Sequence, residues 1–266
     1  MLKDITIGQY YPTGSYIHKL DPRTKILITF ALIIGLFIID TFIPYAYIVA
    51  FILLAVYISK IPFKFIIKGL KPLRIIIAIT FVINIFMTPG EAIFGLGPLV
   101  MTREGVYQAF FMAIRLILLV MGTSILTLTT SPIALTDGIE NLLNPFKKIG
   151  VPAHELAMMM TIALRFIPTL LEETDKIMKA QMARGADFES GNIVSRAKSL
   201  VPLLVPLFIS AFRRADELAM AMEARCYRGG ENRTRMKELK MTGKDTVALG
   251  VTVLLLAILI FHRIIL

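Results

Sequence analysis

The hydrophobic positions of this chain gather in long runs that are separated by short polar or charged segments. The runs cover residues 26–39, 45–58, 75–88, 106–130 and 246–262. A helix needs about 20 apolar residues to cross a bilayer, and the shorter runs reach about that length with their uncharged flanks. The pattern predicts an all-α polytopic membrane protein with about five transmembrane helices and long cytosolic helices between the fourth and the fifth.

The segment between the fourth and fifth runs carries charges of both signs. Residues 131–245 hold 17 of the 29 basic and 14 of the 19 acidic residues, so this part is expected to be largely cytosolic. Proline and polar residues predict helix starts within it, and the predicted helices run from 132 to about 143, from 152 to 182, and from about 190–193 to 223. We therefore expect an N-terminal membrane domain (1–130), a cytosolic and interfacial helical domain (131–245) and a C-terminal transmembrane helix (246–266).

The two long cytosolic helices end in related sequences. Ala183-Arg184-Gly185 closes the first and Ala224-Arg225-Cys226 closes the second, 41 positions later (225 minus 184). Glycine just past a helix and a cation in the last turn are ordinary capping features, which alone explain a single such end. Their repetition favours a shared function, in which two guanidinium groups project from one end of a helix pair and dock into a protein partner.

Composition and charge agree with a membrane setting. The chain of 266 residues is 56% hydrophobic with a mean hydropathy of +0.72, and a soluble domain of this size is less apolar. The net charge of +10 is also typical of nucleic-acid binders, but 26 of the 29 basic residues lie in three segments assigned to the cytosolic side, 1–25, 60–74 and 131–245. We expect a cytoplasmic N-terminus, an external C-terminus, contact with the lipid bilayer and no nucleic-acid partner.

Three parts of the membrane region have a more specific interpretation. Residues 60–74 are predicted to form a basic amphipathic helix at the cytosolic interface, and residues 89–98 an external loop rich in glycine and proline. Arg115 lies near the middle of the fourth run, where an unpaired guanidinium costs at least about 2.5–3.5 kcal/mol. This residue is either a functional intramembrane charge or one half of an ion pair with an acid from a neighbouring helix.

Half of the 14 methionines lie in the long cytosolic helices. Ordinary helix packing accounts for them, whereas the alternative is a surface of flexible thioethers that adapts to several partners. The residues are Met158, Met159, Met160, Met178, Met182, Met220 and Met222.

Motifs of catalysis are not found. The sequence contains no Gly-x-x-x-x-Gly-Lys-Ser/Thr, no His-Glu-x-x-His and no Gly-x-Ser-x-Gly. His18 has no second metal ligand nearby in the sequence, and Cys226 is the single cysteine. We expect neither an enzyme nor a cofactor or metal site.

Several of these sequences together resemble a known family. The N-terminal segment Gly14–Lys25, the segment Leu164–Pro168 and the two arginine ends look like the transmembrane T component of energy-coupling factor (ECF) transporters, over nearly the whole chain. The resemblance implies a membrane scaffold that couples two ABC-type ATPases to a separate membrane-embedded S component, which holds a vitamin or a metal ion. It also implies that Arg184 and Arg225 sit in grooves of the two ATPases. Cys226 departs from the family's usual Ala-Arg-Gly, which leaves the geometry of the second end open.

Other functions remain open from the sequence. The chain could be a dedicated T component for cobalt or nickel uptake, in place of a module shared by several S components. From a different class, it could be a membrane scaffold or enzyme that works without ATPases. In the ECF interpretation, the methionine surface holds the S component, through Met158, Met159, Met178, Met182, Met220 and Met222.

Overall fold

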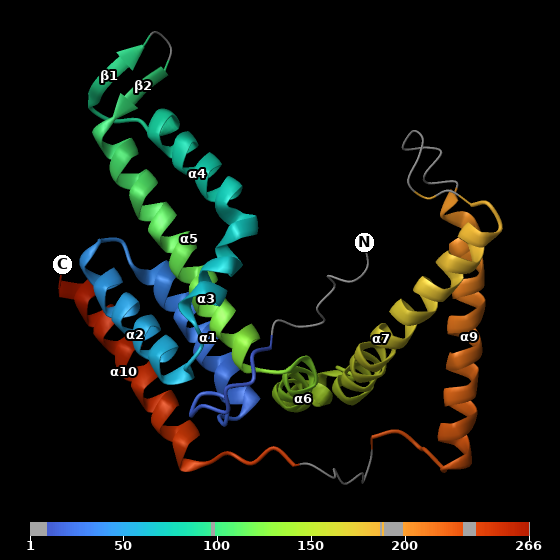
Figure 1. The fold of residues 1–266 in the computed structure, drawn as a ribbon. Coiled ribbons are helices and arrows are strands. Elements are labelled where there is room, and N and C mark those ends of the chain that lie inside the picture. The colour runs from blue at the N-terminus through green and yellow to red at the C-terminus, as the bar shows by residue number, and fades with distance from the viewer. Residues whose placement is uncertain (1–9, 97–98, 187, 189–198, 231–237, 266) are drawn as a thin grey trace. The chain divides into compact units, whose positions relative to one another are not determined.

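A computed structural model describes residues 10–96, 99–186, 188, 199–230 and 238–265 (Figure 1). It is helical almost throughout, which confirms the predicted all-α membrane fold. The chain forms two compact units: residues 8–138 together with 238–266 make a membrane unit, and residues 139–237 together with 1–7 make a second unit, called here the coupling unit.

The elements follow the predicted runs closely. In chain order they are α1 (Pro22–Ile38), α2 (Ile43–Ser59), α3 (Phe63–Leu70), η2 (Lys71–Leu73), α4 (Arg74–Met87), β1 (Ala92–Leu96), β2 (Leu99–Thr102), α5 (Arg103–Thr129), α6 (Pro132–Leu143), η3 (Asn144–Ile149), α7 (Ala153–Ala183), α9 (Val201–Ala224) and α10 (Gly243–Ile265). The helix start predicted at 190–193 lies outside the described residues, and within them α9 begins at Val201.

Helix starts are set by local chemistry. Asp21 caps α1 by accepting a hydrogen bond from the backbone N–H of Arg23, and Pro22 occupies the first turn, where no N–H donor is needed. Thr102 caps α5 in the same way by accepting from the N–H of Gly105 at 3.0 Å. The cap at Asp21 explains why the start of α1 could be predicted from the sequence, whereas α5 begins at Arg103, shortly before the predicted run at 106–130.

The core of the membrane unit lies among α1, α2, α5 and α10, which run side by side in Figure 1. Its fully buried side chains come from all of these helices and from α3. They include Leu36, Ile48, Ile52, Ile66, Leu128 and Leu259. Helix α4 packs mainly along α5 and β2 and none of its residues is buried, so much of its apolar surface faces outward, as expected of a membrane-exposed helix.

Four helices of the described residues are long and apolar enough to cross a membrane: Phe63–Met87, Arg103–Thr129, Ala153–Ala183 and Gly243–Ile264. Helix α2 is apolar but shorter. The first of the four joins the predicted interfacial helix to the predicted third span, because Pro72 lies at the start of a 3₁₀ turn and tightens the helix there without ending it. Residues 63–70 keep the predicted amphipathic pattern, with Ile66 buried and the lysines exposed.

The prediction of an irregular external loop at residues 89–98 is wrong in one respect. Residues 92–96 and 99–102 form two antiparallel strands, with Ala92 opposite Thr102 and Leu96 opposite Leu99. Gly95 and Pro98 favour a loop by composition, but the apolar residues around them pair locally within a short hairpin.

The start of α10 is joined to the start of α1, although the two lie more than 200 residues apart. The carboxylate of Asp245 is 1% exposed and accepts the backbone N–H of Asp21 at 2.7 Å. It also accepts the N–H and the hydroxyl of Thr242, at 2.8 and 2.7 Å. Arg23 pairs with Asp21 at 2.8 Å and donates to the carbonyl of Leu239. The buried carboxylate of Asp245 therefore holds the start of α10 against the start of α1.

His18 fixes the turn that precedes α1. Its Nε2 lies 2.8 Å from the carbonyl oxygen of Tyr11, which can only accept, so this nitrogen carries the proton. Its Nδ1 lies 2.7 Å from the hydroxyl of Ser15, which can donate to it. Burial lowers the pKa of His18, and the nearby ammonium of Lys25 lowers it further. The neutral imidazole is therefore the form that this turn holds.

The lowered pKa predicts a pH dependence of stability. The unfolded chain has the ordinary histidine pKa of 6.5, so the contribution of His18 is present above that pH and is lost as the pH falls through the lower folded-state pKa. His18→Gln, which keeps an N–H donor for Tyr11 and does not titrate, should flatten the curve of melting temperature against pH between about 7 and 5. Identical curves for the two proteins would contradict the assignment.

The coupling unit is built on α7 and α9, which pack antiparallel. At one end, the side-chain amide of Gln181 donates to the carbonyl of Pro202. In the middle, Arg214 forms an ion pair with Glu173 at 2.8 Å, and the hydroxyl of Ser210 donates to the same carboxylate. The end of α7 therefore lies beside the start of α9, as Figure 1 also shows.

Candidate functional site

Both arginine ends have the same backbone structure. After α7, Gly185 takes the left-handed conformation with φ 91°, and its N–H donates to Met182 at 3.0 Å. The N–H of Ala186 then donates to Gln181 at 2.9 Å. These two bonds define a Schellman motif, which satisfies the last carbonyl groups of the helix.

The second end repeats these bonds at the same offset of 41 residues (226 minus 185). The N–H of Cys226 donates to Glu223 at 2.8 Å, and that of Tyr227 donates to Met222 at 3.0 Å. Cys226 takes the left-handed conformation with φ 55°. The absence of glycine therefore leaves the geometry of the second tip intact, and a side-chain-bearing residue takes the strained position.

This comparison predicts opposite effects of two substitutions. Gly185→Ala should destabilise the first tip by about 1 kcal/mol, because a Cβ in the left-handed conformation costs about 1–2 kcal/mol. Cys226→Gly should stabilise the second tip, by less than about 1 kcal/mol, because the greater freedom of glycine in the unfolded chain offsets part of the gain. Amide hydrogen exchange of Ala186 and Tyr227, the residues whose N–H groups close the motifs, measures both changes. Effects of the same sign at the two tips would contradict this account.

Arg184 and Arg225 are both exposed, and neither guanidinium contacts an acid among the described residues. The expectation that they project from one end of the helix pair is wrong, because α7 and α9 are antiparallel. Arg184 lies beside the start of α9, whereas Arg225 lies near Met158 in the second turn of α7. Since α9 has 24 residues, it separates the two tips by about 36 Å.

A groove of about 500 Å³ lies at the second tip. It is lined by apolar side chains of α7 and α9 and by the segment that follows α9. The lining residues are Met158, Ile162, Leu218, Met222 and Arg225–Gly229. The groove therefore combines two arginines with two methionine side chains at one helix end.

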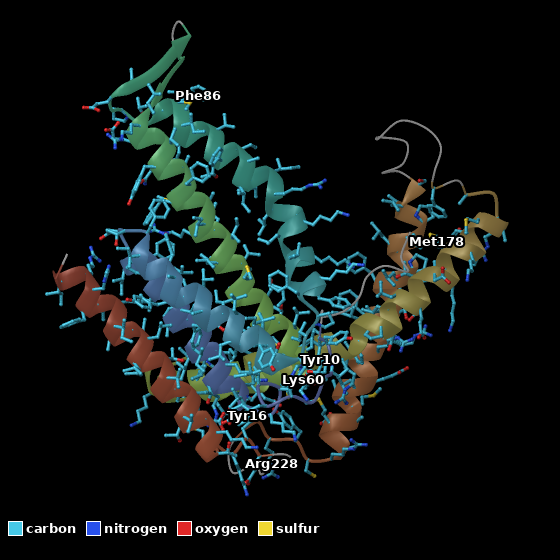
Figure 2. The ribbon with its side chains drawn as sticks, turned by 60° about the vertical axis from the view of Figure 1, so that its left-hand side comes forward. Tyr10, Tyr16, Lys60, Phe86, Met178 and Arg228 are labelled. Atoms are coloured by element: carbon cyan, nitrogen blue, oxygen red, sulfur yellow. The ribbon has the colours of Figure 1, made fainter. Side chains whose placement is uncertain are left out.

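The methionines predicted as a partner surface do not form one patch. Met158 and Met222 lie in the groove at the second tip. Met178 and Met182 lie at the opposite end of α7, where Figure 2 labels Met178. Met159, Met182 and Met220 are about half exposed. The residues thus belong to separate surfaces at the two ends of the helix pair.

A hydrogen-bonded chain behind the second tip was not predicted from the sequence. His154, in the first turn of α7, forms a hydrogen bond with each ring nitrogen. Nδ1 lies 3.0 Å from the carboxylate of Glu140, and Nε2 lies 3.3 Å from the hydroxyl of Tyr227. Gly230 packs so closely on this imidazole that a Cβ would lie 2.4 Å from a ring carbon. No sequence spacing indicates the partners of His154. These hydrogen bonds hold the segment after Arg225 against the start of α7.

Among the described residues, Arg115 is bonded to neutral groups, and the acid expected by the ion-pair interpretation is not among its partners. Its guanidinium donates to the carbonyl of Ile39 at 2.7 Å and to the hydroxyl of Tyr45 at 3.3 Å. It also lies over the rings of Phe37 and Phe111, at 5.5 and 4.8 Å from their centroids. Ile39 is the C-cap of α1, so the positive charge stands at the negative end of that helix dipole.

In the part of the chain that the structure describes, no three His, Cys, Asp or Glu side chains lie close enough to hold a metal ion. The matching caps make the two exposed arginine tips, at opposite ends of the antiparallel helix pair, the candidate site.

Known proteins are similar to this chain in sequence over nearly its whole length. A family model described as "Cobalt transport protein" matches residues 13–236. A protein of Thermosediminibacter oceani named energy-coupling factor transporter transmembrane protein EcfT is 68% identical over 254 residues, 96% of each chain. Proteins of the same name from Clostridium kluyveri and Bacillus subtilis are 64% and 50% identical, and each alignment covers at least 98% of both chains. The chain therefore belongs to the family of transmembrane T components of energy-coupling factor transporters.

Proposed function

We propose that the chain couples two ABC-type ATPases to a membrane-embedded S component, and that ATP-driven movement is transmitted through Arg184 and Arg225. The observation that carries this proposal is the repeated tip: two exposed arginines, each beside an identical Schellman cap, at opposite ends of one helix pair. A repeat of both residue and backbone geometry suits two similar partners, one at each tip. The chain itself has no catalytic role, and ATP hydrolysis belongs to the partners.

The separation of the tips supports two docking sites over one. Two guanidinium groups about 36 Å apart are too far apart to enter a single groove. Each fork can make bidentate hydrogen bonds to a carboxylate and keeps its charge at any physiological pH. Closure of an ATPase pair would then draw the tips toward each other.

The helix pair is suited to transmit that movement. Glu173, Ser210 and Arg214 tie α7 to α9 at one point between the tips. Because helices are stiff over this length, a displacement at the tips becomes a rotation about this point. The S component would take up the rotation on surfaces that include Met158, Met159, Met178, Met182, Met220 and Met222.

The cargo in this proposal is a vitamin or another micronutrient, carried by S components that share the chain. The alternative is a T component dedicated to one metal-ion S component, and the description of the matching family model as a cobalt transport protein favours it. In both cases the location is the cytoplasmic membrane of a prokaryotic cell, with the N-terminus inside as the distribution of basic residues predicts.

Purification of the tagged chain from native membranes in mild detergent, followed by mass spectrometry of the bound proteins, tests this function. Two ATPases with several S components would support a shared module. Two ATPases with one S component would support the dedicated system and identify its substrate class. Recovery of the folded chain without any ATPase would overturn the proposal.

A further inference from the structure

The membrane unit contains an apolar cavity, partly open at the protein surface, that the proposed function does not use. It measures about 210 Å³ and lies among the ends of α1, α2, α5 and α10 and the segment before α1. A group the size of one water molecule needs about 10–15 Å³ of such volume, so the cavity has room for roughly fifteen groups of that size. This is close to the number of carbons in one lipid acyl chain.

The lining of the cavity excludes water as its stable content. Almost all of the lining surface is hydrocarbon, from side chains such as Leu32, Phe51, Ile52, Ile125 and Val251. Buried water is held by two to four polar partners, and the polar groups here are confined to one end. That end carries Lys25, Thr29 and Thr129 together with Tyr16.

The polar end of the cavity is positively charged. Lys25 is 6% exposed and donates to the carbonyls of His18 and Thr129, at 3.2 and 3.0 Å, which bring no negative charge. Asp21 and Asp245 attract its ammonium, but both carboxylates are buried and bonded elsewhere. Lys25 therefore presents its charge to the cavity without a directly paired acid among the described residues.

Exposed cations surround the same end. The ammonium of Lys244 lies 5.4 Å from the centroid of the Tyr16 ring, and Tyr16 lines the cavity. Lys60 follows Ser59, whose carbonyl accepts the hydroxyl of Thr13 at 2.7 Å, so it lies beside the segment before α1. Figure 2 shows Tyr16 and Lys60 at this end of the membrane unit. Lysines next to a membrane-embedded apolar space attract anionic lipid headgroups.

From the cavity, its hydrocarbon lining and the cations at its polar end, we propose that the membrane unit binds one anionic phospholipid. One acyl chain occupies the cavity among α1, α2, α5 and α10, and the headgroup lies against Lys244 and Lys60. The lipid then adds contacts among four helices that already pack around one core. This inference does not depend on the proposed coupling function.

A fluorescence experiment tests the site directly, because the chain contains no tryptophan. Phe51→Trp places a single fluorophore at the cavity. Leu53→Trp is the matched control, since Leu53 lies two residues away on the same helix, is about half exposed and does not line the cavity. Both variants of the full chain are reconstituted in phosphatidylcholine vesicles, into which phosphatidylglycerol with brominated acyl chains is titrated.

We expect quenching of the Phe51→Trp variant to saturate at a low mole fraction of the brominated anionic lipid, and quenching of Leu53→Trp to rise in proportion to the lipid added. Brominated phosphatidylcholine should give the proportional curve at both positions. Proportional quenching at both positions with the anionic lipid, or saturation that does not distinguish the two headgroups, would overturn the proposal.

A second measurement leaves Phe51 in place. Mass spectrometry of the intact protein after detergent washing should find one phosphatidylglycerol retained per chain. Ala55→Leu, which projects a larger side chain into the cavity, should reduce this retention several-fold, and Ala50→Leu, at an exposed position of the same helix, should leave it unchanged. Equal retention in the two variants would overturn the proposal.

Discussion

Charge reversal at both tips, Arg184→Glu together with Arg225→Glu, is expected to abolish the association of ATPases with the purified chain and the uptake that depends on it. Removal of one partner of a buried, hydrogen-bonded charge pair at an interface costs about 2–5 kcal/mol, or more than tenfold in affinity, and reversal adds repulsion. Each single reversal should weaken association through one tip. Arg→Lys at either tip should have a smaller effect, because the charge remains but the bidentate fork is lost.

The measurement is the amount of ATPase that copurifies per folded chain, together with uptake in membrane vesicles. Two controls are offered by the same helices. Arg213→Glu changes an exposed arginine of α9 twelve residues before the second tip (225 minus 213), and Lys179→Glu changes an exposed lysine whose i,i+4 pair with Asp175 contributes little. Both should keep the ATPases bound. If the double tip variant retains them as well as the controls do, the coupling role of the two arginines is wrong.

Asp245→Ala is expected to lower the free energy of unfolding of the membrane unit by about 3 kcal/mol. The substitution removes a carboxylate that is 1% exposed and leaves the buried backbone N–H of Asp21 without its acceptor. Thr242 loses the acceptor of its N–H and hydroxyl at the same time. Asp245→Asn should have an intermediate effect, because its amide oxygen can still accept from Asp21 while its NH₂ group cannot accept from Thr242.

Thermal unfolding of the purified protein in one detergent measures this difference. Asp40→Ala is the control, since Asp40 pairs with Arg263 at 3.2 Å but both side chains are more than half exposed. Exposed pairs contribute about 0–1 kcal/mol, so the control should melt within a few degrees of the unsubstituted protein. Equal shifts for Asp40→Ala and Asp245→Ala would show that the buried carboxylate does not hold α10 to α1.

The helices were the most predictable part of the fold. Long apolar runs specify spanning helices because the bilayer interior leaves backbone groups no partner except their own helix. Asp21-Pro22 and Ser131-Pro132 specify helix starts through local capping, and α1 and α6 begin where these sequences predict. The hairpin at 92–102 was missed because its pairing needs two short segments to meet, which turn-forming residues alone do not reveal.

The candidate site was predictable in its residues and not in its arrangement. Capping needs only neighbouring residues, so the sequence indicated both arginine tips, and the matching left-handed conformations of Gly185 and Cys226 agree with that repeat. The antiparallel packing that places the tips at opposite ends depends on Glu173 meeting Arg214, 41 residues away (214 minus 173). Likewise, no local pattern brings Tyr227 to His154.

The membrane class of this protein, its helices, the cap of each tip and its family could all be predicted from the sequence, because they depend on hydrophobicity, on neighbours along the chain and on shared motifs. The partners of the buried polar groups became clear only in the folded chain, where Arg115 bonds to the end of α1 and Asp245 to the start of α1. A buried charge must find partners wherever folding brings them, and the distance along the chain does not constrain that choice.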